Sequence, residues 1–381
     1  MRVRRVDPSD GDDVRAFVDL PFLLYRDCRQ WVPPLVNDVK GVVDRRRHPF
    51  YQHSDAEFFV AEEAGQAVGR IAMLENRNFN AYNHCRAALF FYFDCVDDKL
   101  AARSLFDAAF GWMRERGLNQ VIGPKGFHPT DGLGLLVEGF EHRPAMGIPY
   151  NYAYYSSLLS DNGFTKRGDL LSGYLSGQTE LPERYYALAE KVKARRGLRI
   201  HRFSNKAEMR QWLKRGAAVL NEAFEGGPDF CPITEAEFQV AAEQMLVLID
   251  PRLIKLVMKG DQIVGFLFGF PDLSAALQRC RGRLWPLGWL YLLWELRRTK
   301  WVNMNGLGLL PGYRGVGGNV LLYTEMTKTV KEFGFEHVES VQVGEENSKS
   351  LEENEIFGVQ WYKRHRVFER ALEARAFGAT G

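Results

Sequence analysis

The pattern of apolar and polar positions predicts strands and helices in an order that occurs twice along the chain. Residues 58–74 and 253–270 each form two β-rich runs around a glycine-containing turn, which predicts two hairpins. Residues 182–195, 207–224 and 234–249 have the pattern of helices. Each copy has the order strand, helix, helix, hairpin, strand, helix, strand, helix, strand. The pattern therefore predicts an α/β protein.

Matching segments at a nearly constant spacing show that the order is a sequence repeat. The strand and helix start at Arg2 occur again at Arg199, an offset of 197 residues. The hairpin turn at 66–69 occurs again at 262–265, an offset of 196. A repeat of this length indicates two copies of a whole domain, because solenoid units are much shorter.

A third match supports the same domain division. Asn151 and Asn347 are again 196 residues apart, and each precedes a glycine at a similar distance. We predict a first domain at 1–176, a linker helix at 177–197 and a second domain at 198–381.

Each copy contains one insertion of its own. The first follows a strand and includes His128 and Asp131 in a loop rich in glycine and proline, with Tyr150 and Asn151 shortly after it. These four residues are candidates for binding an acceptor substrate. The alternatives are a solvated turn for the loop and a core-facing aromatic helix for the tyrosines.

The second insertion, at about 273–300, is apolar and rich in tryptophan. Residues 284–296 contain three tryptophans and are flanked by arginines, but they are too short to span a bilayer. Three interpretations stay open: a helical hairpin packed on its own domain or in a homodimer, a wall for a long acyl chain or lipid-like acceptor, and peripheral attachment to an anionic membrane.

The second copy also contains a glycine-rich turn between a strand and a helix, at 309–319. Glycines allow consecutive N–H groups to point into one turn, and the helix that follows adds unpaired N–H groups and a positive dipole end. The turn therefore predicts a site for a phosphate or pyrophosphate, to which Arg314 could add a charge-assisted bond. The alternative is a connector that binds no ligand.

The order of elements and the string L-x-P-x-Y-R-G-x-G-x-x resemble the GCN5-related N-acetyltransferases, or GNAT proteins. The resemblance implies a mixed sheet whose central strands splay apart around an acyl-CoA. It also implies that the pyrophosphate binds the glycine turn and that the thioester carbonyl meets a backbone N–H near Leu309. The resemblance assigns binding of acetyl-CoA or another acyl-CoA, with no metal, to Leu309, Leu310, Tyr313, Arg314, Gly315, Val316, Gly317, Gly318, Asn319 and Asn347.

The first copy departs from this pattern at the matching position. Residues 94–99 carry three carboxylates and no glycine there, which would repel a pyrophosphate. We predict that the first copy is degenerate for the cofactor and that these acids cap the helix that starts near Asp98.

The tyrosine that many GNAT proteins use as a general acid would fall at Asn354, which cannot donate a proton in that way. The remaining catalytic candidates are weak. Glu339 could act as a base, with a surface strand carboxylate as the alternative, and Asn305 could orient a water molecule. Tyr362 is the third candidate, with a structural role as the alternative.

Composition excludes several other classes. The chain has 50 Lys and Arg against 48 Asp and Glu, a formal charge of +2, so a strongly basic nucleic-acid binder is not expected. Its 5 cysteines form no C-x-x-C pair, so neither a disulfide framework nor a zinc site is indicated. No signal peptide and no membrane-spanning stretch is recognised, so we expect a cytoplasmic protein, with peripheral membrane attachment as the open alternative.

Together these features predict an acyl-CoA-dependent acyltransferase, in the first place an N-acetyltransferase, acting on an amine-bearing small molecule or peptide. Two alternatives remain: a non-catalytic ligand-binding protein of the same fold, and an acyltransferase that acts on lipids or long acyl chains at a membrane surface.

Overall fold

The computed structural model describes residues 1–128 and 131–372. Contacts between residues divide the chain into two units. The first contains residues 1–170 together with the described residues 364–372, and the second contains Leu171–Lys363. Strands β7 (Thr165–Ser176) and β13 (Gln360–Ala371) contribute to both units, because the division falls within them.

The first unit contains a mixed sheet in which β4 and β5 are parallel and the other strand pairs are antiparallel. Its strand order is β1-β2-β3-β4-β5-β13, with β6 paired to β13. The strands that lie wholly in this unit are β1 (Arg2–Arg5), β2 (Asp55–Glu63), β3 (Gln66–Glu75), β4 (Ala87–Cys95), β5 (Gln120–Gly123) and β6 (Leu135–Glu138). The helices are α1 (Gly11–Leu24), α2 (Val36–Val43), α3 (Arg77–Tyr82), α4 (Lys99–Glu115) and α5 (Tyr155–Asp161).

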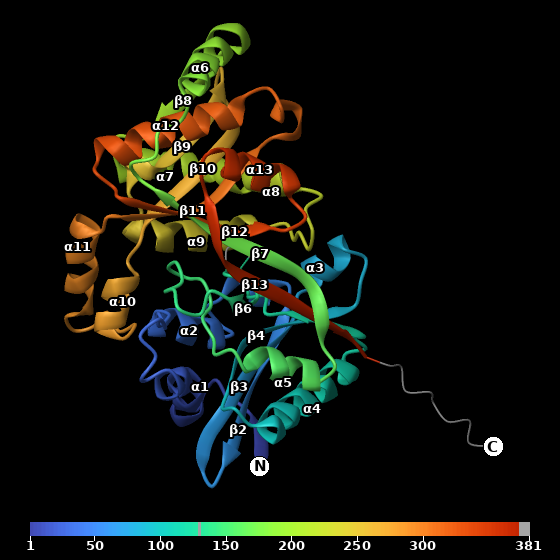
Figure 1. The fold of residues 1–381 in the computed structure, drawn as a ribbon. Helices are drawn as coiled ribbons and strands as arrows, with labels where there is room; N and C mark the ends of the chain where they lie inside the picture. The colour runs from blue at the N-terminus through green and yellow to red at the C-terminus, as the bar shows by residue number, and fades with distance from the viewer. Residues whose placement is uncertain (129–130, 373–381) are drawn as a thin grey trace. The chain divides into compact units, whose positions relative to one another are not determined.

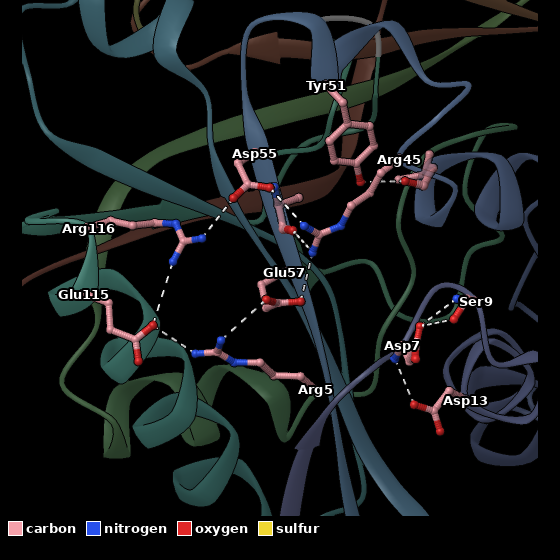
Figure 2. A network of polar contacts seen from close by, with 12 residues as sticks. Arg5, Asp7, Ser9, Asp13, Arg45, Tyr51, Asp55, Glu57, Glu115 and Arg116 are labelled. Carbon is pink, nitrogen blue, oxygen red and sulfur yellow. Dashed lines mark hydrogen bonds and ion pairs between the residues drawn. The ribbon is translucent and has the colours of Figure 1, made fainter.

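Ion pairs join β1, β2 and α4 of this unit (Figure 2). Glu57 on β2 lies 3.0 Å from Arg45 and 3.9 Å from Arg5. Asp55 lies 3.3 Å from Arg45 and 2.9 Å from Arg116, the residue that follows α4. Burial raises the pKa of Glu57, and the two arginines oppose that increase. The network therefore holds α4 against the strands while its apolar face enters an aromatic core.

The second unit also contains a mixed sheet, with the order β7-β12-β11-β10-β9-β8. The strands that lie wholly in this unit are β8 (Leu198–Arg202), β9 (Ile254–Lys259), β10 (Gln262–Pro271), β11 (Trp301–Leu309) and β12 (His337–Gly344). The helices are α6 (Glu183–Arg196), α7 (Lys206–Trp212), α8 (Gly216–Phe224), α9 (Glu235–Leu248), α10 (Ser274–Cys280), α11 (Gly288–Arg298), α12 (Gly318–Glu332) and α13 (Ser348–Ile356) (Figure 1).

Most predicted elements are confirmed. Both hairpins form, as β2–β3 and β9–β10, and the apolar insertion forms the helices α10 and α11. The single helix predicted at 207–224 is wrong, because a 3-10 helix at Leu213–Arg215 interrupts it. At Gly216, where α8 begins, an added Cβ would lie 2.2 Å from the ring of Phe238. The start of α8 is therefore set by close packing against α9.

The two units do not follow the predicted division at 176 and 198. Within the first unit, Phe368–Ala371 of β13 pair antiparallel with β5. Within the second unit, β7 pairs with β12, and the Ser172 hydroxyl accepts the N–H of Gln342. Each copy of the repeat thus contributes part of its last strand to the sheet of the other unit. Helix α6 packs on α12 and places Ala189 and Val192 in the second core.

Candidate functional site

The two parallel strands of the second sheet, β11 and β12, pair over only part of their length. The pairing runs from Trp301 and His337 as far as Met304 and Ser340. Beyond that point β11 remains paired with β10 up to Leu309, without a partner on β12. This arrangement is the splayed pair of strands that the sequence resemblance implies.

A bulge in β11 lies where the splay begins. Phe268 and Gly269 of β10 pair with Gly306 and Met304, so Asn305 has no opposite residue in β10. Asn305 is exposed. The bulge bends β11 beside the point where its pairing with β12 ends.

The backbone at the end of β11 directs one N–H group toward the side of the strand that is no longer paired with β12. The N–H of Leu310 donates to the carbonyl of Val264 on β10, at 3.0 Å. Successive N–H groups of a strand point in opposite directions, so that of Leu309 points away from β10. The site therefore has one backbone donor at Leu309, next to the turn that follows.

The turn between β11 and α12 forms a concentration of backbone donors. Gly315 and Gly317 have φ of 74° and 96°, and α12 begins at Gly318 with no side chain capping its N-terminus. Within 1–128 and 131–372, no acceptor binds the N–H groups of 315–320. An added Cβ at Gly317 would lie 2.5 Å from Val192, so close packing as well as φ requires glycine there. The geometry is that of an anion-binding turn.

Two polar side chains of the turn stabilise the loop rather than enter it. The Arg314 guanidinium donates to the carbonyls of Ala223, at 2.9 Å, and Leu309, at 3.3 Å. Arg314 therefore holds the turn against the end of α8, whereas the sequence suggested a bond to phosphate. The Asn319 amide donates to Glu353 on α13, at 2.7 Å.

The other residues assigned to the cofactor have mainly structural contacts. Leu310 is buried in one apolar cluster, which Tyr313 also contacts, and Val316 packs against another. Asn347 accepts the N–H of Ser350 and caps α13. The donors available to an anion are thus backbone groups, at Leu309 and 315–320.

The matching position of the first unit is closed by its own side chains. β4 ends at Cys95, whose N–H donates to the Tyr155 hydroxyl at 3.0 Å and whose carbonyl accepts from the Tyr154 hydroxyl at 2.7 Å. Asp98 accepts the N–H groups of Leu100 and Ala101, at 2.6 and 3.1 Å, and caps α4. The predicted cap at Asp98 is confirmed. The donors that are open at Leu309 and α12 are therefore occupied at the corresponding places in the first unit.

Replacing Tyr155 by Phe should lower the free energy of unfolding by about 1–3 kcal/mol, because the buried N–H of Cys95 would lose its acceptor. Urea unfolding measures this change. Tyr291→Phe, at an exposed position of α11, serves as the control and should change the free energy by less than about 0.5 kcal/mol. Equal effects of the two substitutions would contradict the assignment of Tyr155 as the group that closes β4.

The four acceptor candidates of the first unit have local structural roles. His128 and Asp131 close a turn: the His128 N–H donates to the Asp131 carboxylate at 2.9 Å, and the Asp131 N–H donates to the His128 carbonyl at 3.0 Å. Burial raises the pKa of Asp131, and His128 opposes the increase. Asn151 is buried, with its amide bonded to both backbone groups of Leu136, and Tyr150 donates to the Phe140 carbonyl.

A buried polar cluster lies beside the point where β11 and β12 separate. Glu339 is 2.6 Å from Lys363, both side chains are almost fully buried, and Tyr362 donates to the same carboxylate. Burial raises the pKa of Glu339, and Lys363 opposes the increase. Asn303 pairs in register with Glu339 and is buried, with no hydrogen-bond partner for its amide among the described residues. The structure thus brings Glu339 and Tyr362 together and leaves Asn305 on the bulge.

This cluster corrects one alternative from the sequence. Glu339 is not a surface carboxylate, since only 3% of the residue is exposed. Lys363 was missed, because a lysine in a predicted strand is normally a solvent-facing residue. The sequence of this strand contains no apolar alternation that marks Lys363. In the structure, Lys363, His365 and Val367 are buried and the residues between them are partly exposed.

No group of three or more His, Cys, Asp or Glu side chains within 1–128 and 131–372 is arranged to hold a metal ion. Over the same residues, no helix has the length and apolar character needed to cross a membrane.

No family model matches the chain. Protein YghO of Escherichia coli (strain K12) is 27% identical over 375 residues, which cover 95% of this chain and 93% of that protein. Bacterial ceramide synthase of Caulobacter vibrioides (strain NA1000 / CB15N) is 26% identical over 370 residues, covering 94% and 95%.

Solved structures of similar fold extend over nearly the whole chain. A tandem GNAT protein from the clavulanic acid biosynthesis pathway covers 98% of this chain and 99% of its own, with a TM-score of 0.58 and 12% identity. A GCN5-related N-acetyltransferase from Sphaerobacter thermophilus covers 98% and 96%, with a TM-score of 0.52 and 15% identity. Together with the splayed strands and the glycine turn, these likenesses show that the chain has the fold of the GCN5-related N-acetyltransferases in its tandem form.

Proposed function

We propose that the second unit binds an acyl-CoA at the N-terminus of α12 and that the protein transfers the acyl group to an amine. One observation carries the proposal. The N–H groups of Leu309 and 315–320 lack acceptors among the described residues, whereas Tyr155 and Asp98 occupy the corresponding groups of the first unit. The backbone donors are unoccupied in the second copy and occupied in the first. This difference supports ligand binding by the second copy alone.

The donors fit the chemistry of this substrate. Backbone N–H groups at a helix N-terminus favour the negative charge of a pyrophosphate. The N–H of Leu309 could polarise a thioester carbonyl, because it points away from β10 on the side of the splay. In the reaction the amine nitrogen bonds to the acyl carbon, the carbon–sulfur bond breaks, and the proton lost by the amine ends on the thiolate. Glu339 is the candidate group for moving that proton.

A second, narrower function is favoured by a specific observation. A relative that matches over nearly its whole length is named a bacterial ceramide synthase, and a ceramide is the amide of a fatty acid with a long-chain amino alcohol. An amino lipid acceptor and a long acyl chain are therefore the first substrates to test beside acetyl-CoA and a small amine. The exposed apolar surface of α11 agrees with an acceptor of this kind.

Two measurements test the proposal. Saturating CoA, acetyl-CoA or palmitoyl-CoA should raise the Tm by about 5 °C or more, because each binds only the folded protein. Release of free thiol from the acyl-CoA should then depend on added acceptor, with a short primary amine compared against a long-chain amino alcohol.

The outcomes separate the alternatives. No Tm increase with any of the three ligands would contradict the site. An increase without acceptor-dependent thiol release from either amine would favour the non-catalytic ligand-binding alternative. Faster release from palmitoyl-CoA with the amino alcohol than from acetyl-CoA with the short amine would support the lipid-directed function.

A further inference from the structure

Helices α10 and α11 form a hairpin (Figure 1). This hairpin exposes a dense group of large apolar side chains. Seven of the sixteen large apolar residues that are exposed within 1–128 and 131–372 lie between positions 285 and 294. Trp285 is the most exposed, at 84%. We call this group the α11 patch; its members are Trp285, Leu287, Trp289, Leu290, Tyr291, Leu293 and Trp294. Contiguous apolar surface of this kind marks an interaction site.

The burial of α11 shows that the five patch members within 289–294 form the outer face of this helix, while the other two lie just before it. Only Gly288 and Leu292 of α11 are buried, one helical turn apart. An added Cβ at Gly288 would lie 1.9 Å from the carbonyl of Arg283, so this contact requires glycine. Leu290 and Trp294 are also one turn apart, on a side that faces solvent. A surface helix normally places polar residues on such a side, whereas α11 places a leucine and a tryptophan there.

Positive charge surrounds the α11 patch. Six basic residues and a single acidic residue, Glu295, occur between positions 279 and 300, and Glu295 is already paired with Arg279 at 3.7 Å. The guanidinium groups of Arg279 and Arg298 lie 4.6 and 4.5 Å from the centre of the Trp294 ring. Tryptophan and arginine side by side at an apolar surface are typical of segments that lie in the headgroup region of a bilayer.

The length of α11 and the positive charge around it together identify the partner of the α11 patch. A helix of 11 residues is about 16 Å long, far short of a hydrocarbon core of about 30 Å, so α11 could lie in the membrane surface but not cross it. Anionic phospholipids match the excess positive charge, since basic residues near such a surface are attracted to it. We propose that the α10–α11 hairpin docks the protein on an anionic phospholipid surface, with the α11 patch among the headgroups.

This inference goes beyond the proposed function and does not depend on it, because docking needs no acyl-CoA. The full chain, without CoA, should co-sediment with vesicles of equal parts phosphatidylglycerol and phosphatidylcholine. It should bind vesicles of phosphatidylcholine alone much more weakly. Raising the salt concentration should weaken binding to the anionic vesicles, because the positive charges around the patch would be screened.

Two matched double substitutions locate the contact. Leu290→Ser with Leu293→Ser removes two leucines of the α11 patch and should weaken vesicle binding about 10-fold or more. Leu23→Ser with Leu100→Ser removes two leucines that are 66% and 58% exposed in the first unit and should leave vesicle binding unchanged. Circular dichroism and Tm show whether both variants keep the fold.

Three outcomes would overturn the proposal. The wild-type chain could fail to bind anionic vesicles, or the two double variants could bind equally well. Light scattering could instead show a dimer that the Leu290→Ser, Leu293→Ser double substitution converts to a monomer, while the wild type does not bind vesicles. This result would assign the patch to contact with a second copy of the chain. In each case CoA binding, measured without vesicles, would still report on the proposed function separately.

Discussion

Gly315→Asp is expected to weaken CoA binding by about 100-fold or more, whereas Gly315→Asn should weaken it by less than about 10-fold. An added Cβ at Gly315 meets nothing within 4 Å, so both side chains fit. Both residues tolerate positive φ, and both carry the same backbone strain at a φ of 74°. The two variants therefore differ only in a negative charge placed at the proposed pyrophosphate site.

Isothermal titration calorimetry with CoA measures the two affinities, and thermal unfolding without ligand confirms that both variants are folded. A negative control is available in the first unit. Asp97→Asn removes a carboxylate at the corresponding turn and should leave CoA binding unchanged. Equal affinities of the Gly315→Asp and Gly315→Asn variants would contradict a pyrophosphate site at this turn.

Glu339→Ala is expected to lower the free energy of unfolding by about 3–5 kcal/mol, because it would leave the ammonium group of Lys363 buried without its partner. The double substitution Glu339→Leu with Lys363→Met removes both charges and should recover most of this loss. Urea unfolding of wild type, single and double variants measures the difference. A double variant as unstable as Glu339→Ala would show that the ion pair is not the cause.

The double variant also tests the chemical role of Glu339. If this carboxylate moves the proton of the amine, the folded double variant should bind CoA normally and lose acceptor-dependent thiol release by about 100-fold or more. Normal release by the folded double variant would leave Glu339 with a structural role only. Tyr362 would then have the same role, since its hydroxyl donates to that carboxylate.

The part of the site made by backbone could be predicted from the sequence. Glycines at 315, 317 and 318 between a strand and a helix permit the positive φ angles that let consecutive N–H groups point into one turn. The acids at 94–98 predict a cap that the structure confirms at Asp98. The roles of Arg314 and Asn319 could not be predicted. Each side chain bonds to a residue far away in sequence, Ala223 or Glu353, and local pattern contains no information on such a partner.

The fold shows the same limit. The repeat and the hairpins follow from periodicity, but the exchange of the last strands does not. The order of elements is identical whether β7 and β13 pair within their own copies or with the other unit. The burial of Glu339 could not be predicted from the sequence either. A carboxylate in a strand is buried only when another strand supplies a partner such as Lys363, and the sequence does not show which strands are neighbours. Closure of β4 by Tyr154 and Tyr155 depends on tertiary contacts in the same way.

The stoichiometry of CoA binding to the wild-type chain tests the central claim most directly. Calorimetric titration of the full chain should give one CoA per chain, because the donors at Leu309 and 315–320 are open while Asp98, Tyr154 and Tyr155 close the first unit. The Gly315→Asp variant should weaken that single binding event by about 100-fold or more. Two CoA molecules per chain, or one CoA whose affinity Gly315→Asp leaves unchanged, would contradict the account.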